Sequence, residues 1–283
     1  MANLKDRVAL ITGAGSGIGY QTALSFAREG AKVAVADRRD ERVRELAERI
    51  AESGGEALAI AADVSKREDV RRMVQAATER FGRIDVLVNN AGYALGASIE
   101  DTTERDFQEL WETNVLGVLM GMQETLPVMR RQGSGHIINV ASAAGKIAYP
   151  GIGAYSATKH AIVALTDALR AEVADDGIHA SIVYPIGTRT EFFESARLVN
   201  GATVGPHGPT QSAEHVAKRI VACAKRPTLE VLPYRPLRLG IILNSIVPAL
   251  LAFIGRRAHR QQTRRGERQI APPIQQEEEA PHG

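Results

Sequence analysis

Cysteine is almost absent from the chain, because Cys223 is the single one among 283 residues. One thiol forms no internal disulfide and gives no pair of cysteines with zinc-ligand spacing, so we expect no metal site. The N-terminal segment holds only a short apolar run before its glycines, which is too short for the apolar stretch of a signal peptide. These absences predict a protein of a reducing compartment, the cytoplasm.

A strong net charge is also missing. Lys and Arg number 35 and Asp and Glu 33, so the formal net charge is +2. This balance gives no general attraction to nucleic acid, and we expect no nucleic-acid partner. With 44% hydrophobic and 24% charged residues, the composition is that of a soluble globular protein. The length suits one large α/β domain.

The chain has no apolar run long enough to span a bilayer. Residues 237–260 are apolar and then basic, but the apolar core is about 14 residues, against about 20 for a span. One interpretation is that this extension packs on the substrate lid or on a partner subunit. The other is peripheral membrane attachment, with Arg256, Arg257 and Arg260 contacting anionic head groups. Residues 261–283, basic and then acidic, predict a disordered tail.

What the chain does have is a regular alternation of strand-like and helix-like segments. The strand candidates are 7–12, 32–37, 56–63, 84–92, 135–142, 177–185 and 228–233. The helix candidates are 19–30, 41–55, 66–81, 103–131, 154–175 and 212–225. The strands are nearly continuous apolar runs, which is typical of a parallel sheet covered by helices on both faces. The pattern predicts an α/β fold built from βαβ units, in one domain that ends near residue 235.

A glycine-rich turn follows the first strand. Residues 12–19 read TGAGSGIG and open the first helix. Gly13, Gly17 and Gly19 permit a tight turn and let the backbone approach a pyrophosphate, while the helix N-terminus offers N–H groups and a positive dipole end. Turns of this kind also occur without any ligand. The context of strand, turn and helix favours dinucleotide binding.

Acidic residues end the second and third strands. Asp37 lies about 20 residues beyond the glycine turn, where a carboxylate accepts hydrogen bonds from ribose hydroxyls and repels a 2′-phosphate, which favours NAD. Arg38 and Arg39 favour NADP instead, because an arginine at this position can hold the 2′-phosphate of NADP. Asp37 can alternatively cap the next helix. Asp63 can accept from an adenine amino group, but a turn-forming role is the simpler interpretation.

Tyr155 and Lys159 lie one helical turn apart in the segment YSATK. Positions i and i+4 share a helix face, so an ammonium near the phenol is expected to lower the pKa of Tyr155 toward neutral. Such a tyrosine can give a proton to a carbonyl oxygen or take one from an alcohol. Ser142 ends the strand 135–142 and reaches the same sheet edge, where its hydroxyl can bond the reacting oxygen. Asn114 is a polar residue inside an apolar helical stretch, where it can satisfy a buried group or hold a water.

The order and spacing of TGAGSGIG, NNAG (89–92), Asn114, Ser142 and YSATK resemble the short-chain dehydrogenase/reductase family over residues 4–233. The resemblance implies a Rossmann-type doubly wound sheet of seven parallel strands, and a homodimer or homotetramer with helices 103–131 and 154–175 at the interface. It implies a catalytic set of Tyr155 as acid/base, Lys159 as its electrostatic partner, Ser142 as substrate-oxygen ligand and Asn114 as relay support. The implied cofactor-binding residues are Gly13, Ser16, Gly17, Ile18, Gly19, Asp37, Arg38, Asp63, Val64, Asn90, Ala91, Gly92, Tyr155, Lys159, Thr188 and Thr190.

One segment departs from the family pattern. The run after the sixth strand is YPIGTRTEFF, with Ile186 where the family has glycine and Thr188 where it has an apolar residue. Because isoleucine rarely adopts a positive φ, we expect the backbone there to run differently. Residues 186–211 form the predicted lid, and its Phe192 and Phe193 indicate an apolar pocket wall.

The leading hypothesis is an oxidoreductase that transfers a hydride between NAD and an apolar alcohol or ketone. One alternative is an NADPH-dependent reductase of ketones or 3-oxoacyl chains. Another is a cofactor-binding sensor or scaffold without turnover. Such proteins tend to lack the tyrosine or the lysine, and this chain keeps both Tyr155 and Lys159.

Overall fold

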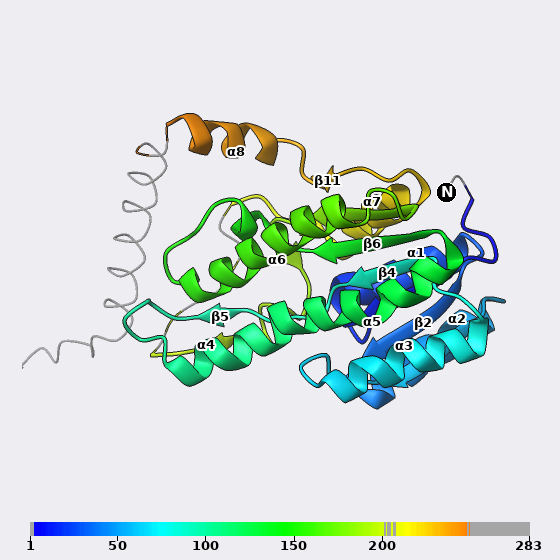
Figure 1. Cartoon of the computed structure of the whole chain (residues 1–283). Coiled ribbons are helices and arrows are strands. Elements are labelled where there is room, and N and C mark those ends of the chain that lie inside the picture. Colours follow the sequence, from blue (N-terminus) through cyan, green and yellow to red (C-terminus); the bar gives the residue numbers. More distant parts are fainter. Residues whose placement is uncertain (1–2, 201, 203–204, 206–207, 248, 250–283) are drawn as a thin grey trace, which may run out of the picture. The chain divides into compact units, whose positions relative to one another are not determined.

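Seven of the apolar runs pair into one parallel sheet, in the order β11-β7-β6-β4-β1-β2-β3 (Figure 1). The computed structural model describes residues 3–200, 202, 205, 208–247 and 249. The sheet strands are β1 Val8–Thr12, β2 Lys32–Asp37, β3 Ala57–Ala61, β4 Val86–Asn89, β6 Gly135–Val140, β7 Ile178–Val183 and β11 Glu230–Val231. The central strands β1, β4 and β6 are buried throughout, as their continuous apolar sequence predicts.

Helices connect the strands. They are α1 Gly17–Arg28, α2 Asp40–Glu52, α3 Arg67–Phe81, α4 Glu104–Trp111, α5 Gly117–Gln132, α6 Gly153–Glu172, α7 Ala213–Lys225 and α8 Leu237–Ile246. A π-helical turn, η1 Glu112–Leu116, joins α4 to α5, and a short 3₁₀ turn, η2 Ala143–Gly145, follows β6. Two pairs of two-residue strands lie outside the main sheet: β5 Leu95–Gly96 with β9 Arg197–Leu198, and β8 Thr188–Arg189 with β10 Gln211–Ser212.

The sheet separates two hydrophobic layers. Side chains of α3, α5 and α6 form the layer on one face, and those of α1, α2 and α7 form the layer on the other. Successive strand residues enter opposite layers, since Leu10 of β1 belongs to the first and its neighbour Ile11 to the second. Both faces of the central strands are therefore closed to solvent, and a ligand can approach these strands only at their ends.

The direction of winding reverses between β1 and β4. The chain builds outward from β1 through β2 to β3, and then from β4 through β6 and β7 to β11 on the other side. In doubly wound sheets the ligand crevice opens at the carboxyl ends of the strands beside such a switch point. The glycine turn after β1 and the NNAG segment after β4 flank it here.

The predicted fold class, a Rossmann-type doubly wound parallel sheet of seven strands, is confirmed. The predicted helix 103–131 is divided in the structure into α4, η1 and α5. The short strands β5, β8, β9 and β10 were not predicted, because two-residue bridges leave no periodic pattern. Nor was a helix predicted for α8, whose composition alone leaves its conformation open.

Two compact units divide the chain, residues 1–241 and residues 242–283. Of the second unit the structure describes 242–247 and 249. The described residues do not include the predicted tail 261–283, most of the predicted extension 236–260 beyond α8, or residues 201, 203, 204, 206 and 207 of the predicted lid. Among the helices that are described, none has the length and apolar character to cross a bilayer.

Candidate active site

One large cleft opens at the carboxyl edge of the sheet, and it has a volume of about 770 Å³. Most of the predicted site residues line it: Gly13, Ser16, Gly17, Ile18, Asp37, Arg38, Asp63, Val64, Asn90, Ala91, Gly92, Ser142, Tyr155, Lys159, Thr188 and Thr190. Segments far apart in the sequence are thus brought to one place. Gly19 and Asn114 do not line the cleft, but both contact residues that do.

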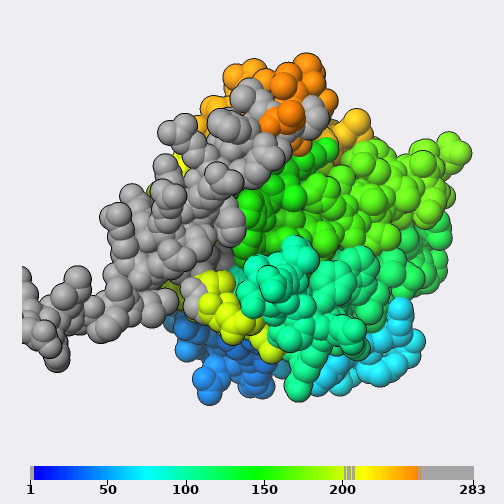
Figure 2. Space-filling view, turned by 90° about the vertical axis from the view of Figure 1, so that its left-hand side faces the viewer, coloured from blue at the N-terminus to red at the C-terminus, as the bar shows by residue number. Residues whose placement is uncertain are grey.

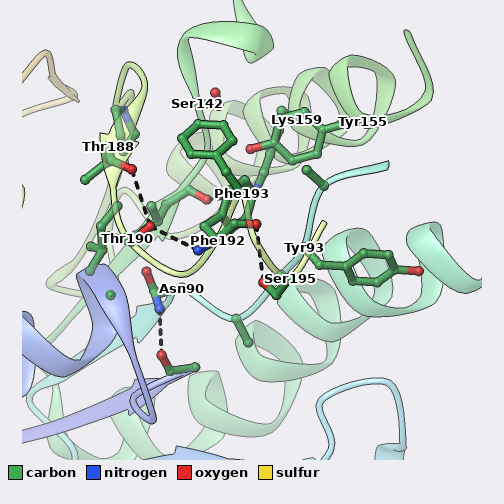
Figure 3. A pocket seen from close by; sticks show the side chains of 18 of the residues that line it. Asn90, Tyr93, Ser142, Tyr155, Lys159, Thr188, Thr190, Phe192, Phe193 and Ser195 are labelled. Carbon is green, nitrogen blue, oxygen red and sulfur yellow. Dashed lines mark hydrogen bonds between the residues drawn. The ribbon is translucent and has the colours of Figure 1, made fainter. Parts of the chain in front are cut away.

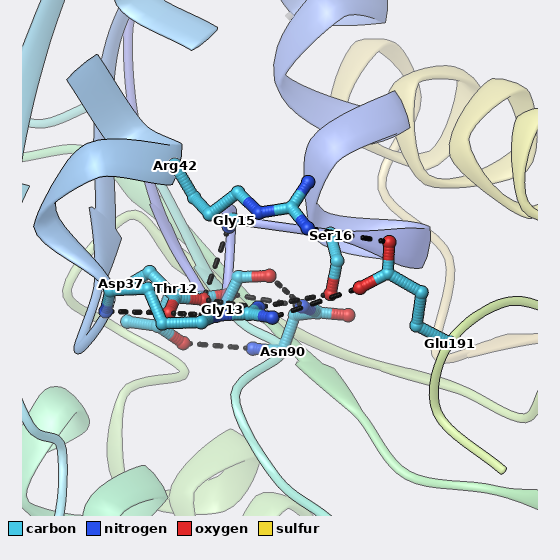
Figure 4. Close-up of polar contacts among 9 residues, drawn as sticks. Thr12, Gly13, Gly15, Ser16, Asp37, Arg42, Asn90 and Glu191 are labelled. Carbon is cyan, nitrogen blue, oxygen red and sulfur yellow. Dashed lines mark hydrogen bonds and ion pairs between the residues drawn. The ribbon is translucent and has the colours of Figure 1, made fainter. Parts of the chain in front are cut away.

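The glycine turn and the NNAG segment are tied directly to each other (Figure 4). The Asn90 side-chain amide donates to the backbone oxygens of Thr12 and Gly13, at 3.0 and 3.1 Å. The Thr12 hydroxyl in turn accepts from the backbone N–H of Asn90 and of Ala91. Asn90 therefore holds the shape of the glycine turn from the neighbouring strand end.

Two glycines of the turn are required by close packing. Gly13 has φ +64°, and a Cβ there would lie 2.8 Å from the Ala91 Cα. A Cβ on Gly19 would collide with the backbone oxygen of Gly13 and lie 2.6 Å from the Asn90 amide nitrogen. Gly19 thus supports the turn from behind and leaves the exposed side of the turn to the cleft.

Asp37, which is buried at the end of β2, forms an ion pair with the exposed side chain of Arg39. The Asp37 carboxylate accepts from the Gly15 N–H at 3.1 Å, from the Arg39 N–H at 3.0 Å and from Arg39 Nε at 3.0 Å. Burial alone would raise the pKa of Asp37, but the hydrogen bonds and charge of Arg39 leave that pKa lowered, so the group is an anion at neutral pH. The Arg39 guanidinium also donates to Ser16 Oγ at 3.0 Å, while Arg38 is exposed and lines the cleft.

Asp63 adopts the turn-forming arrangement. Its carboxylate accepts from the Ser65 N–H at 3.0 Å and from the Ser65 hydroxyl at 2.7 Å, which is a local Asx turn. Asp63 still lines the cleft, next to Val64. Val64 also packs against α5, since a Cβ on Gly117 would lie 3.0 Å from its methyl group.

Tyr155 and Lys159 are both buried on α6, at 7% and 4% exposure. Figure 3 shows the Tyr155 hydroxyl pointing into the cleft. Lys159 Nζ lies 5.6 Å from the centre of the Tyr155 ring and donates to the Val140 backbone oxygen at 3.2 Å. Burial raises the pKa of the Tyr155 phenol to about 12, and it lowers the pKa of Lys159 to about 8. The predicted lowering of the tyrosine pKa is therefore wrong for this structure, because desolvation by burial outweighs the lowering effect of Ser142.

Ser142 lies two residues after the end of β6 and caps the short turn η2. Its hydroxyl oxygen accepts from the Ala144 N–H at 3.1 Å. The Ser142 side chain acts to lower the pKa of the Tyr155 phenol, against the effect of burial. Ser142 and Tyr155 come from different elements, and both line the cleft.

Asn114 is fully buried in the π-helical turn η1. Its side-chain oxygen accepts from the Tyr93 N–H at 3.1 Å, and its amide donates to the Tyr93 backbone oxygen and to the Thr158 hydroxyl. Both amide hydrogens are engaged, so one lone pair of the oxygen remains for a water. The side chain therefore joins the segment after β4 to α6. Inserted π turns of this kind are frequent at functional sites.

The segment from Pro185 to Thr190 runs without a positive φ at Ile186 or at Gly187. Thr188 is buried, and its hydroxyl donates to the Ile186 backbone oxygen and accepts from Gln211 Nε2. This geometry agrees with the expectation that isoleucine would avoid the left-handed conformation. Thr190 lies against the glycine turn, where a Cβ on Gly17 would be 3.2 Å from its methyl carbon.

The lid carries ion pairs to both halves of the site. Glu191 lies 3.8 Å from Arg39 and 3.9 Å from Arg42, and Figure 4 shows it facing the latter across the turn. Further along, Arg197 pairs with Asp106 at 2.5 Å and with Glu109 at 2.6 Å, both on α4. In Figure 2 the segment approaching residue 200, yellow, lies against the teal surface of α4.

The sequence did not indicate several residues of the cleft wall. They are Tyr93, Glu109, Glu112, Tyr149, Ile152, Arg197, Tyr234 and Leu237. Only the position of Tyr93, directly after NNAG, offered a signal at the sequence level. The ring of Phe192, which was predicted to line the pocket, lies 6.0 Å from that of Tyr155, centre to centre.

These residues fit a dinucleotide. Gly13, Gly15 and Gly17 carry no side chains of their own that a pyrophosphate would meet, and the N-cap residue Ser16 makes no side-chain bond to the N-terminus of α1, whose dipole favours an anion. An anionic carboxylate, Asp37, lies at the end of the adjacent strand. The crevice, the anion site and the acidic residue occur in the order that a nicotinamide dinucleotide requires.

Comparisons with known proteins agree with this assignment. An uncharacterized oxidoreductase of Listeria innocua is 40% identical over 194 residues, 68% of this chain and 78% of that protein. A short chain dehydrogenase/reductase from Burkholderia phymatum, solved in complex with NAD, is 28% identical with a TM-score of 0.80, over 89% of this chain and 97% of that one. A 3-ketoacyl-(acyl-carrier-protein) reductase from Brucella melitensis, complexed with NADH, is 32% identical with a TM-score of 0.71, over 82% and 99%.

The family model described as short chain dehydrogenase matches residues 7–214. That range runs from β1 into α7 and includes the glycine turn, Asn114, Ser142 and the YSATK segment. The chain therefore belongs to the short-chain dehydrogenase/reductase family and is an NAD(P)-dependent oxidoreductase.

Proposed function

We propose that the protein interconverts an apolar alcohol and its ketone with NAD as cofactor. The observation that supports this most strongly is that the Tyr155 and Ser142 side chains line the same cleft, with the Lys159 ammonium 5.6 Å from the centre of the tyrosine ring. Two hydroxyl groups that converge on one point can both contact a single substrate oxygen. The proposed catalytic domain is residues 1–235, with the lid at about 186–211.

The proton moves between Tyr155 and the substrate oxygen. With a pKa raised to about 12 by burial, the phenol is protonated at neutral pH and is ready to donate to a ketone oxygen. In the reverse direction the phenolate takes the hydroxyl proton of an alcohol, which is favoured at higher pH. Ser142 donates a hydrogen bond to the same oxygen as its negative charge develops.

Lys159 stabilises the phenolate. Its ammonium lies near the ring in a buried setting, where a charge acts more strongly than it does in water. The same group is proposed to hold a ribose hydroxyl of the cofactor. Asn114 holds the backbone of Tyr93 in place and offers its remaining lone pair to a relay water.

The bound nicotinamide ring supplies the hydride acceptor for alcohol oxidation and the hydride donor for ketone reduction. Residues of the glycine turn and of the segment after β4 are proposed to bind it, together with Thr188 and Thr190. The preference for NAD rests on Asp37, whose lowered pKa keeps an anion where a 2′-phosphate would lie. Arg39, which now pairs with Asp37, must release the carboxylate oxygens to ribose hydroxyls.

An apolar substrate suits the remaining wall of the cleft. Aromatic and aliphatic side chains line the same cleft as Tyr155 and Ser142: Tyr93, Tyr149, Ile152, Phe192 and Phe193. Phe192 packs against the Tyr155 ring and excludes water from the phenol. Such a lining favours substrates whose carbon skeleton makes no hydrogen bonds.

A second candidate is an NADPH-dependent reductase of ketones or 3-oxoacyl chains. Arg38 favours it, because this exposed side chain lines the cleft one residue after Asp37 and can reach a 2′-phosphate. Similarity to the 3-ketoacyl reductase from Brucella melitensis also favours it. Titration with NAD and with NADP separates the two candidates, since tighter binding of NADP would favour the second.

The protein is further proposed to form a homodimer or homotetramer through α4, α5 and α6. Two large apolar side chains on the first part of this surface, Phe107 and Leu116, are each 37% exposed. Exposed apolar groups on neighbouring elements are typical of an interface between subunits.

Replacement of Tyr155 by phenylalanine tests the proposed chemistry. Tyr155→Phe removes only the hydroxyl, so we expect turnover on a panel of alcohols and ketones to fall by about 10²–10⁴-fold, the usual worth of an acid/base group. Binding of NADH, measured by its fluorescence, should be retained. Tyr149→Phe removes a hydroxyl from the same cleft and serves as the control, with turnover close to that of the original protein. Equal turnover of both variants would exclude Tyr155 as the proton donor.

A further inference from the structure

The C-terminal extension contributes to the wall of the cleft. Tyr234 and Leu237 line it, although both follow the last sheet strand. Leu237 is 9% exposed and opens α8, and Ile241 packs, one turn later, against the hydrophobic layer of α3, α5 and α6. One side of the first turns of α8 is therefore part of the core and of the substrate site.

A second side of α8 is apolar and exposed. Leu239, Ile242, Leu243 and Ile246 are exposed by 73%, 46%, 40% and 72%. Their spacing of i, i+3, i+4 and i+7 places them on one face of the helix. We call these four residues the exposed α8 face. A contiguous apolar face of this kind marks a site of interaction rather than an ordinary soluble surface.

The sequence that contains α8 carries charges of one sign. No aspartate or glutamate occurs between Glu230 and Glu267. The stretch between them holds seven arginines: Arg235, Arg238, Arg256, Arg257, Arg260, Arg264 and Arg265. Arg235 and Arg238 flank the start of α8 within the described residues, and both are exposed. Apolar side chains next to an uninterrupted positive stretch complement a surface of anionic lipid head groups.

We propose that the exposed α8 face lies in the interfacial layer of an anionic lipid bilayer, and that the cleft takes its substrate from that layer. Leu237 connects the two functions, because it begins the helix and also lines the cleft. The substrate class is then a lipophilic alcohol or ketone that partitions into bilayers. The first half of the proposal stands on the helix alone, and the second half rests on the proposed function.

Vesicle flotation of the full-length protein tests the first half. We expect recovery with vesicles of phosphatidylglycerol and phosphatidylcholine, and much weaker recovery with phosphatidylcholine alone or at high salt. The double variant Leu239→Ser/Ile246→Ser should lower the partition coefficient by on the order of a hundredfold, about tenfold for each apolar side chain removed. Leu229→Ser is the matched control, since Leu229 is 62% exposed but lies directly before β11, outside α8. It should float like the original protein.

Three results would overturn the first half. The first is that the original protein fails to float with anionic vesicles at low salt. The second is that the double variant floats as well as the control, and the third is that the double variant has a lower mass than the original protein in lipid-free light scattering, which would mean that a second copy of the chain covers the exposed α8 face.

Activity measurements test the substrate supply separately. A long-chain alcohol presented in anionic vesicles should be oxidised with a several-fold lower kcat/KM by the double variant, whereas a short water-soluble alcohol should be oxidised equally by both. Equal rates on the vesicle-bound alcohol would overturn the second half. No turnover of any alcohol or ketone by the original protein would contradict the proposed function, while the flotation result would still decide the membrane contact.

Discussion

Burial of Lys159 should cost the folded protein stability, so its replacement by methionine is expected to stabilise the fold while it abolishes turnover. The pKa of the ammonium falls from 10.5 to about 8 on burial. At about 1.4 kcal/mol per pKa unit, the charged lysine disfavours folding by about 3 kcal/mol at neutral pH. Loss of the hydrogen bond to the Val140 oxygen, at 3.2 Å, offsets about 1–2 kcal/mol of this. The free energy of unfolding of Lys159→Met should therefore be about 1–2 kcal/mol higher than that of the original protein, and its Tm should be higher by a few degrees.

The pH dependence gives the sharper test. Between about pH 8 and 10.5 the unfolded chain keeps the Lys159 proton that the folded protein has lost, so the stability of the original protein rises with pH there. The rise from this group is about 1.4 kcal/mol per pH unit. Lys159→Met lacks it, so the stability gap between the two proteins is constant below pH 8 and narrows or reverses toward pH 10.5.

Urea unfolding at pH 7, 8, 9 and 10, followed by the fluorescence of the single tryptophan, Trp111, measures this gap. Lys218→Met is the control, because the Lys218 side chain is 67% exposed on α7 and its loss removes a solvated charge. A Lys159→Met protein that is no more stable than the original at pH 7, with a gap that stays unchanged up to pH 10, would refute the reasoning.

Three further predictions concern the cofactor, the lid and the assembly. Asp37→Ala should shift the ratio of kcat/KM for NADP over NAD upward by on the order of tenfold to a hundredfold, since like charges side by side cost several kcal/mol; an unchanged ratio would remove Asp37 from cofactor selection. Arg197→Ala should raise KM several-fold with little change in kcat, because the lid loses its ion pair to the buried Asp106; a loss confined to kcat would contradict that role. Phe107→Glu with Leu116→Glu should lower the mass found by light scattering, and an unchanged mass would place the interface elsewhere.

The sheet could be predicted because its signals are local and strong. Buried strands such as β1 and β6 read as unbroken apolar runs, and glycines such as Gly30 and Gly133 mark the ends of helices. The glycine turn and Asp37 were placed at the same sheet edge by topology alone, since parallel strands share the direction of their carboxyl ends.

The pKa shifts and ion pairs of the site could not be predicted from the spacing of residues in the sequence. A separation of four residues puts Tyr155 and Lys159 on one helix face, but the sign of the pKa shift depends on burial, which a sequence does not show. The ion pairs of Arg197 with α4 were missed for a similar reason, because their partners lie about 90 residues earlier. The contribution of Leu237 to the cleft was missed because it follows the last strand, beyond the family pattern.

The π-helical turn at Glu112–Leu116 makes the position of Asn114 depend on chain length as well as on residue type. Each residue of a regular helix turns the chain by about 100°, so the removal of one residue from this turn would let α4 and α5 merge into an unbroken helix. The side chains before the deletion would then be rotated by about 100° around the helix axis relative to the side chains after it. A sequence could thus keep every motif of the family and still point its asparagine away from Tyr93, through a change that no comparison of residue identities alone would register.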